Sequence, residues 1–206
     1  MSLHVVERTP AGKPQGTLLL LHGRGADEKD LYPLLDALDP ERRLRGLTPR
    51  APLTLPPGGF HWYRLAGIPT PDPLTFWPSF TALAELIDGL EKPLVLGGFS
   101  QGAVMSYALG LGRPPSDRPV ALMPLSGFMP EVERLELDLT DLAGYPVMIA
   151  HGTLDPVIPV DYSRAAREVL ADARADVAYH EPAVGHTIDP QFIPALRAFV
   201  ASATAR

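Results

Sequence analysis

The sequence predicts an α/β fold in which helices cover both faces of a mostly parallel central sheet. Short, continuously apolar runs alternate along the chain with segments whose apolar residues recur at helical spacing. Polar and glycine residues follow several of the apolar runs, at the places where strands of such a sheet would end. With 206 residues, 46% of them hydrophobic, the chain fits one domain over residues 1–206 at roughly 150 residues per domain.

Apolar runs and helical periodicity place the elements in order. The predicted strands are Thr17–His22, Leu44–Thr48, Pro93–Phe99, Val120–Leu125, Pro146–Ala150 and Asp176–Tyr179. The predicted helices are Leu31–Leu38, Thr81–Leu90, Gln101–Leu111, Val160–Ala171 and Ile188–Val200. Strands that alternate with helices in this way favour a parallel sheet. Residues 49–78 are rich in proline and are predicted to be the least structured stretch, lying over an edge of the sheet.

Composition and charge narrow the classes of function. The net charge of −6 argues against a nucleic-acid partner, which favours a basic face. The absence of cysteine excludes disulfides and thiolate metal sites. The first residues lack the pattern of a signal peptide, and the longest apolar run, Leu18–Leu21, is far shorter than the ~20 residues that span a bilayer. We therefore expect a cytoplasmic protein without integral membrane association.

A serine nucleophile is predicted at Ser100. The segment Gly98–Gly102 matches the pattern G-x-S-x-G and lies between a predicted strand and a predicted helix, which is the context that gives the pattern its meaning. Small residues two positions before and after the serine let the strand and the helix approach closely. The hydroxyl then lies at a helix N-terminus, where the helix dipole favours developing negative charge. The alternative is a tight turn in which Ser100 only caps the helix.

A serine hydroxyl needs a base, and His186 is the predicted one. The expected chain order is serine, acid, histidine, and His186 lies between the last predicted strand and the last predicted helix. The other histidines precede the serine or lie on or beside strands. His151 follows a strand in the pattern His-Gly-x-x-Asp, which indicates a role in supporting that turn.

Asp155 is the predicted acid because it follows the strand 146–150. Its role would be to hold the imidazole in the required tautomer and to stabilise the imidazolium. Asp161 and Asp189 are alternatives, but each opens a predicted helix and is typical of an acid in a first turn.

Two backbone N–H groups are predicted to form an oxyanion hole. One belongs to Gln101, the residue after the nucleophile, and the other to Arg24 in the glycine loop after the first strand. Gly23 and Gly25 let the backbone approach a ligand closely. The alternative is a tight turn with a solvated Arg24, and both interpretations can hold together.

These motifs together resemble the phospholipase/carboxylesterase family of serine hydrolases, which belongs to the α/β-hydrolase superfamily and includes the acyl-protein thioesterases. The matching segments are Leu20–Gly23 with Gly25, Gly98–Ala103, Leu125–Phe128, His151–Gly152 with Asp155–Pro159, and Gly185–His186. The resemblance covers about residues 17 to 200. It implies an α/β-hydrolase fold without a large cap, a Ser100–His186–Asp155 triad, the oxyanion amides of Arg24 and Gln101, no cofactor or metal, and often a homodimer.

A second, local resemblance concerns Trp62. The segment from Arg50 to Tyr63 looks like the family's proline-rich stretch that leads to a pocket-lining tryptophan. Trp62 is therefore a candidate substrate-binding residue. Packing within the loop explains it equally well.

The sequence thus predicts a serine carboxylesterase that forms an acyl-enzyme on a small-molecule ester. Thioesters and lysophospholipids stay open as substrates. Two other functions also stay open: an acyltransferase or peptidase with the same triad, and a hydrolase-like protein that binds a small ligand without turning it over.

Overall fold

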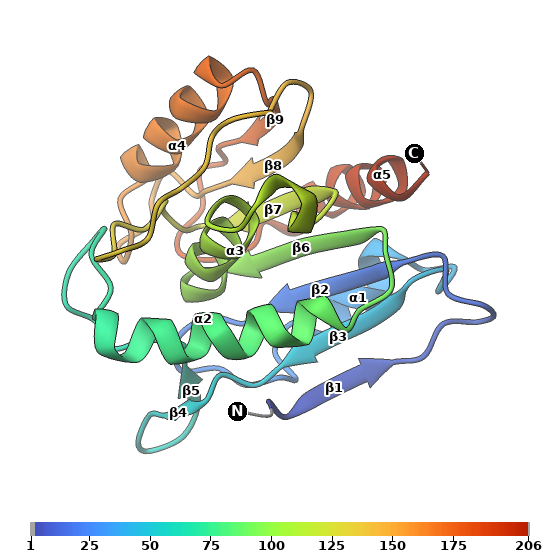
Figure 1. Cartoon of the computed structure of the whole chain (residues 1–206), viewed down its shortest axis with the longest axis horizontal. Coiled ribbons are helices and arrows are strands. Elements are labelled where there is room, and N and C mark those ends of the chain that lie inside the picture. Colours follow the sequence, from blue (N-terminus) through green and yellow to red (C-terminus); the bar gives the residue numbers. More distant parts are fainter. Residues whose placement is uncertain (1–2, 206) are drawn as a thin grey trace.

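The structure is a computed structural model that describes residues 3–205. A seven-stranded sheet forms the centre of the molecule (Figure 1). The strands lie in the order β1-β3-β2-β6-β7-β8-β9. Neighbouring strands are parallel except β1 and β3, which are antiparallel. Their bounds are β1 Val5–Arg8, β2 Thr17–Leu21, β3 Arg45–Pro49, β6 Leu94–Phe99, β7 Ala121–Leu125, β8 Pro146–Ala150 and β9 Asp176–His180. The predicted mostly parallel sheet is confirmed.

Helices cover both faces of this sheet. They are α1 Tyr32–Leu38, α2 Pro73–Asp88, α3 Gln101–Leu111, α4 Asp161–Asp172 and α5 Ile193–Thr204. Side chains of β2 alternate between the two faces, as the pleat requires. Leu18 and Leu20 join the core that includes α1 and α5, whereas Leu19 and Leu21 join the core beneath α2, α3 and α4. No helix in residues 3–205 has both the length and the apolar character needed to cross a bilayer.

Residues 49–78, predicted to be the least structured stretch, contain more regular structure than expected. They contain a small hairpin of β4 (Leu53–Thr54) and β5 (Phe60–His61), and α2 begins within them at Pro73. Asp72 caps α2, and proline suits a first helical turn because its missing N–H has no partner there. Pro78 lies inside the helix, which continues past it since Phe76, Leu83 and Ile87 are fully buried.

Two further elements depart from the sequence prediction. Strand β1 was not predicted, because four residues of mixed polarity carry no clear period. The last helix begins at Ile193 rather than Ile188, since residues 190–192 form a 3₁₀ turn capped by the Asp189 side chain.

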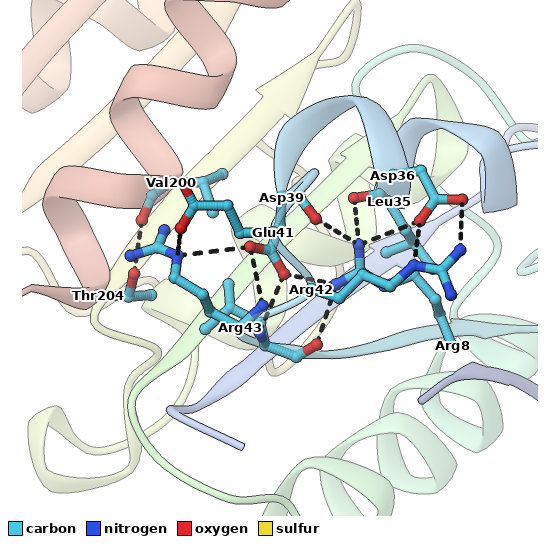
Figure 2. Close-up of polar contacts among 10 residues, drawn as sticks. Arg8, Leu35, Asp36, Asp39, Glu41, Arg42, Arg43, Val200 and Thr204 are labelled. Atoms are coloured by element: carbon cyan, nitrogen blue, oxygen red, sulfur yellow. Dashed lines mark hydrogen bonds and ion pairs between the residues drawn. The ribbon is translucent and has the colours of Figure 1, made fainter. Parts of the chain in front are cut away.

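The side chain of the buried residue Arg8 joins β1 to α1 and to the segment that leads into β3 (Figure 2). Its side chain is 1% exposed and donates to the backbone oxygens of Leu35, Asp39 and Leu44 at 2.7–2.9 Å. The Asp39 carboxylate, also buried, accepts from Arg8 Nη2 at 2.6 Å and from the backbone N–H of Leu44 at 2.9 Å. Arg8 thereby donates hydrogen bonds to carbonyl oxygens at the end of α1 and links the edge strand β1 to that helix.

Replacing Asp39 by asparagine is expected to lower the free energy of unfolding by about 3 kcal/mol, because the buried Arg8 charge would lose its buried carboxylate partner. Urea unfolding followed by circular dichroism measures this. The matched control is Asp36→Asn: Asp36 is 46% exposed and lies 3.5 Å from Arg8, so its loss should cost less than about 1 kcal/mol. Equal losses in both variants would contradict the role given to Asp39.

Candidate active site

Ser100 lies on a strained turn between β6 and α3. Its backbone has φ 54° and ψ −117°, a region that residues with a side chain rarely adopt. Its N–H donates to the carbonyl of Leu125 at 2.9 Å, which ties the turn to the end of β7. The residue is 7% exposed and lines a cavity. The turn therefore presents the hydroxyl at the N-terminus of α3, as the motif predicts.

Glycine is required on both sides of this turn. A Cβ on Gly98 would lie 2.3 Å from the Gly102 backbone, and a Cβ on Gly102 would lie 1.9 Å from the carbonyl oxygen of Leu21. No side chain can be accommodated at such distances. The first turn of α3 therefore rests directly on the end of β2, beside the loop that contains Arg24.

His186 links Ser100 to Asp155. Its Nε2 lies 2.9 Å from Ser100 Oγ, and its Nδ1 lies 2.6 Å from Asp155 Oδ2. Since a carboxylate accepts, we assign the imidazole proton to Nδ1, which leaves Nε2 free to accept from the serine. The structure thus brings together the three side chains that sequence reasoning selected.

Four groups surround the buried Asp155 carboxylate. Oδ1 accepts from the backbone N–H groups of Val157 and Ile158 at 2.8 and 2.9 Å. Oδ2 contacts His186 and, at 3.1 Å, Nε2 of His151. Burial opposes ionisation, but the hydrogen bonds from His186 and the backbone outweigh it, so the pKa of Asp155 lies below its ordinary value. The carboxylate is therefore ionised at neutral pH.

His151 packs beneath the Asp155 carboxylate and supports this turn. The sequence predicted that His151 supports the turn but not which atoms it contacts. It is fully buried, and its Nε2 also lies 2.9 Å from the carbonyl oxygen of Ile158. Its Nδ1 lies 2.6 Å from Ser163 Oγ at the start of α4. Burial lowers the pKa of His151, so the neutral ring donates from Nε2 and accepts from Ser163.

The alternative acids lie elsewhere. Asp161 opens α4 and pairs with Arg164 at 2.7 Å. Asp189 caps the 3₁₀ turn before α5 and lies 3.2 Å from His180 Nε2. Neither contacts His186.

The backbone N–H groups of Arg24 and Gln101 suit the role of oxyanion donors. Both residues line the cavity that contains Ser100. Gln101 is the first residue of α3, where an N–H has no partner within the helix. Within residues 3–205, neither N–H donates to a backbone carbonyl outside the helices, whereas the adjacent Gly25 N–H donates to Phe60 at 2.8 Å.

Trp62 does not line the cavity, which corrects its prediction as a substrate-binding residue. The side chain is 0% exposed, and its indole N–H donates to the carbonyl of His22 at 2.9 Å. The neighbouring Tyr63 lines the cavity instead. A loop without regular periodicity gives no signal as to which of two adjacent aromatic residues faces inward.

The Gln101 side chain holds this loop in place, a role that the sequence did not indicate. Its Oε1 accepts from the Trp62 backbone N–H at 3.0 Å, and its Nε2 donates to the Tyr63 carbonyl at 2.9 Å. The amide thus pairs with the loop as a neighbouring backbone would. Gln101 therefore positions the cavity wall through its side chain, in addition to presenting its own backbone N–H.

The cavity has a volume of about 380 Å³ and a mostly apolar wall. Besides the residues above, it is lined by Leu65, Gly67, Ile68, Phe128, Val157 and Ile158. In the described part of the chain, no group of three or more His, Asp or Glu side chains is arranged to hold a metal ion. A larger depression beside α4 is lined by charged residues such as Arg164 and Glu181, which pair with each other.

An ion pair braces the loop that follows Arg24. Arg50 donates from Nε and Nη2 to the two carboxylate oxygens of Glu28, each at 2.6 Å. These hydrogen bonds lower the pKa of Glu28 to about 2. Next to Arg50, the Ala51 N–H donates to His22 Nε2 at 3.0 Å. The segment after β3 therefore holds the chain on both sides of Arg24, at His22 and at Glu28.

The fold places this chain among the α/β-hydrolases. It superposes on the crystal structure of esterase PE8 with a TM-score of 0.83 and 27% identity, over 98% of this chain and 99% of that one. The Bacillus cereus carboxylesterase gives a TM-score of 0.81 and 26% identity, over 98% and 94% of the two chains.

The chain belongs to the phospholipase/carboxylesterase family, whose profile matches residues 3–204. It is 29% identical to acyl-protein thioesterase 1 of Mycosarcoma maydis over 91% of each chain. These findings confirm the predicted resemblance and make the protein a serine hydrolase that acts on ester bonds.

Replacing Glu28 by glutamine is expected to destabilise the protein at pH 6 and much less at pH 2.5. The folded pKa of Glu28 is about 2 against an ordinary 4.5. Its stabilisation is therefore complete above about pH 5 and is lost as the pH falls through 4.5 toward 2. Urea unfolding at both pH values measures the difference, with the exposed Glu168→Gln as control. A difference between wild type and Glu28→Gln that is independent of pH would contradict the assignment.

Proposed function

We propose that this protein is a carboxylesterase that cleaves its substrate by acyl transfer to Ser100. The observation that carries the proposal is the position of His186, which lies within hydrogen-bonding distance of both Ser100 Oγ and Asp155 Oδ2. A serine becomes nucleophilic when a base accepts its proton, and the base must itself be oriented by a third group. All three groups lie at the carboxyl ends of parallel strands, where α/β sheets bind ligands.

In the first half of the reaction, Ser100 Oγ attacks the carbonyl carbon while His186 Nε2 takes the hydroxyl proton. The N–H groups of Arg24 and Gln101 donate to the oxyanion of the tetrahedral intermediate. The bond to the leaving oxygen then breaks, and the proton passes from His186 to the departing alcohol. The product of this half is an acyl-serine.

In the second half, His186 takes a proton from water, and the hydroxide oxygen attacks the acyl carbon. Collapse breaks the bond to Ser100 Oγ, returns the proton to the serine and releases the carboxylic acid. Asp155 remains ionised throughout and stabilises the imidazolium that forms in each half. The same steps would cleave a thioester.

The cavity fits a small-molecule ester whose acyl part lies against the apolar wall. Every group assigned above belongs to one chain, so the proposed chemistry does not depend on the homodimer that the family resemblance implies. Neither a nucleic acid nor a cofactor takes part in the proposed steps.

Replacing Ser100 by alanine is expected to reduce kcat for 4-nitrophenyl esters by about 10⁴- to 10⁶-fold, because members of such a triad act as a unit. Release of 4-nitrophenolate measures the rate. Ser126→Ala is the matched control: Ser126 also ends a strand with a positive φ of 51° and is buried, but it does not contact His186. We expect its kcat to stay within tenfold of wild type.

Three outcomes would decide against the proposal. Ser100→Ala activity within tenfold of wild type would remove the nucleophile. No turnover of any ester by the wild type would favour a ligand-binding protein, above all if an acid or ester is retained tightly. Ester transfer to an added alcohol in preference to water would favour an acyltransferase.

Removing the His151 ring is expected to lower kcat with little change in KM, because Asp155 would lose a buried donor. His151→Leu should reduce kcat about ten- to hundredfold, whereas His151→Gln, which keeps an N–H donor, should recover much of it. Thermal unfolding of both variants checks that the fold is intact. Equal kcat in His151→Leu and His151→Gln would show that the donor does not matter.

A further inference from the structure

The hydroxyl of Tyr63 is a buried polar group without a protein partner. Tyr63 is 1% exposed and lines the cavity that contains Ser100. Its backbone carbonyl is well satisfied, since it accepts from the Gln101 side chain at 2.9 Å and lies 3.1 Å from His61 Nδ1. No residue in the described range 3–205 accepts from its hydroxyl, and burial is the one influence that raises its pKa.

Three of the other tyrosines have a satisfied hydroxyl. The hydroxyls of Tyr145, Tyr162 and Tyr179 each donate to an oxygen at 2.7–3.2 Å. Tyr107 has an unpartnered hydroxyl as well, but that oxygen is sealed inside the protein. The Tyr63 oxygen is not among the sealed atoms, and Tyr63 is a residue of the cavity wall. Buried donors are normally satisfied, and here the acceptor has to come from solvent or from a molecule bound in the cavity.

An unpaired cation also lines the cavity. Arg24 lines the cavity, and among residues 3–205 no carboxylate lies within ion-pairing distance of its guanidinium. The nearby Glu28 is already held by Arg50. The segment after Arg24 pairs with the segment before Tyr63, because Gly25 N–H donates to Phe60 and Phe60 N–H donates to Ala26, both at 2.8 Å. Arg24 and Tyr63 therefore project from adjacent segments.

We propose that Tyr63 and Arg24 form a subsite for a carboxylate on the acyl part of the substrate. The preferred substrates are then half-esters of dicarboxylic acids. The remaining wall is lined by Leu65, Ile68, Phe128, Val157 and Ile158, which would hold the methylene chain between the two acyl ends. This inference rests on the proposed function, because it places the ester carbonyl at Ser100.

Three 4-nitrophenyl esters that differ only at the far end of a six-carbon acyl chain test the subsite. They are the hexanoate, which ends in methyl, the 6-hydroxyhexanoate, which ends in a neutral acceptor, and the adipate half-ester, which ends in carboxylate. The measured quantity is the ratio of kcat/KM for the adipate half-ester to kcat/KM for the hexanoate. This ratio cancels any effect of a substitution on the ester chemistry common to both substrates.

We expect the wild type to favour the adipate half-ester over both other esters. Tyr63→Phe should lower the ratio about tenfold, because a buried hydrogen bond to a charged group is lost. Arg24→Gln should lower it about threefold, because an exposed cation contributes less. Raising the salt concentration to 0.5 M should lower the wild-type ratio by screening Arg24, on the basis of a Debye length of a few ångströms. Tyr145→Phe, which removes a hydroxyl that donates to the Pro119 carbonyl away from the cavity, and Arg64→Gln are the matched controls, and both should keep the wild-type ratio.

Several results would overturn the subsite. A wild-type ratio of one or less excludes it. A ratio that is unchanged in either Tyr63→Phe or Arg24→Gln excludes a carboxylate shared by the two residues. Equal preference for the 6-hydroxyhexanoate shows a neutral acceptor instead of an anion. Failure of the proposed function looks different, since hexanoate hydrolysis would then survive in Ser100→Ala or be absent from the wild type.

Discussion

The contact between α3 and the end of β2 determines how the rest of the site is arranged. Gly102 lies so close to the carbonyl of Leu21 that no side chain fits between them. This contact places the N-terminus of α3 beside the loop that contains Arg24. The Ser100 hydroxyl, the N-terminus of a helix whose residues are all buried, and both candidate oxyanion amides consequently come together through one backbone approach. The strained φ of Ser100 is the local cost of that approach.

The cavity wall depends on this contact through hydrogen bonds to the backbone. The Gln101 amide holds the backbone of Trp62 and Tyr63, His22 accepts from the Ala51 N–H, and Gly25 pairs with Phe60. Burial lowers the pKa of His22, so its neutral ring accepts at Nε2 and donates from Nδ1 to the Gly23 carbonyl. Because these bonds engage the backbone of the wall, its inward side chains are free to vary without loss of the oxyanion loop. A catalytic centre with a replaceable wall suits a fold that serves several ester substrates.

The sequence predicted those parts of the molecule whose signals are local. Apolar runs located β2, β3 and β6–β9, and the polar residues after them located Ser100, Asp155 and His186, because parallel strands end at one edge of a sheet. Strand β1 was missed because its four residues of mixed polarity carry no clear period, and its partner β3 lies far along the chain. The start of α2 was missed because proline is permitted in a first helical turn, and the packing of Phe76 then carries the helix through Pro78. The exchange of Trp62 for Tyr63 at the cavity has the same origin, because the Gln101 hydrogen bonds that set the loop register link residues about 40 positions apart.

The buried position of the Asp155 carboxylate is the last constraint on the geometry of the site. A fully buried carboxylate stays ionised only when donors replace the water it has lost. Asp155 finds two such donors in its own chain at Val157 and Ile158, and two imidazoles on its other oxygen. His151 is suited to the second imidazole position because burial keeps it neutral, so it donates without adding a charge that would oppose the His186 imidazolium. In the pattern His-Gly-x-x-Asp, the histidine is thus the hydrogen-bond donor, the glycine permits a close backbone contact, and the aspartate is the acceptor. At its glycine, Gly152, a Cβ would lie 2.2 Å from the Val184 carbonyl oxygen, so the tight packing that seats the acid also sets the loop that carries His186.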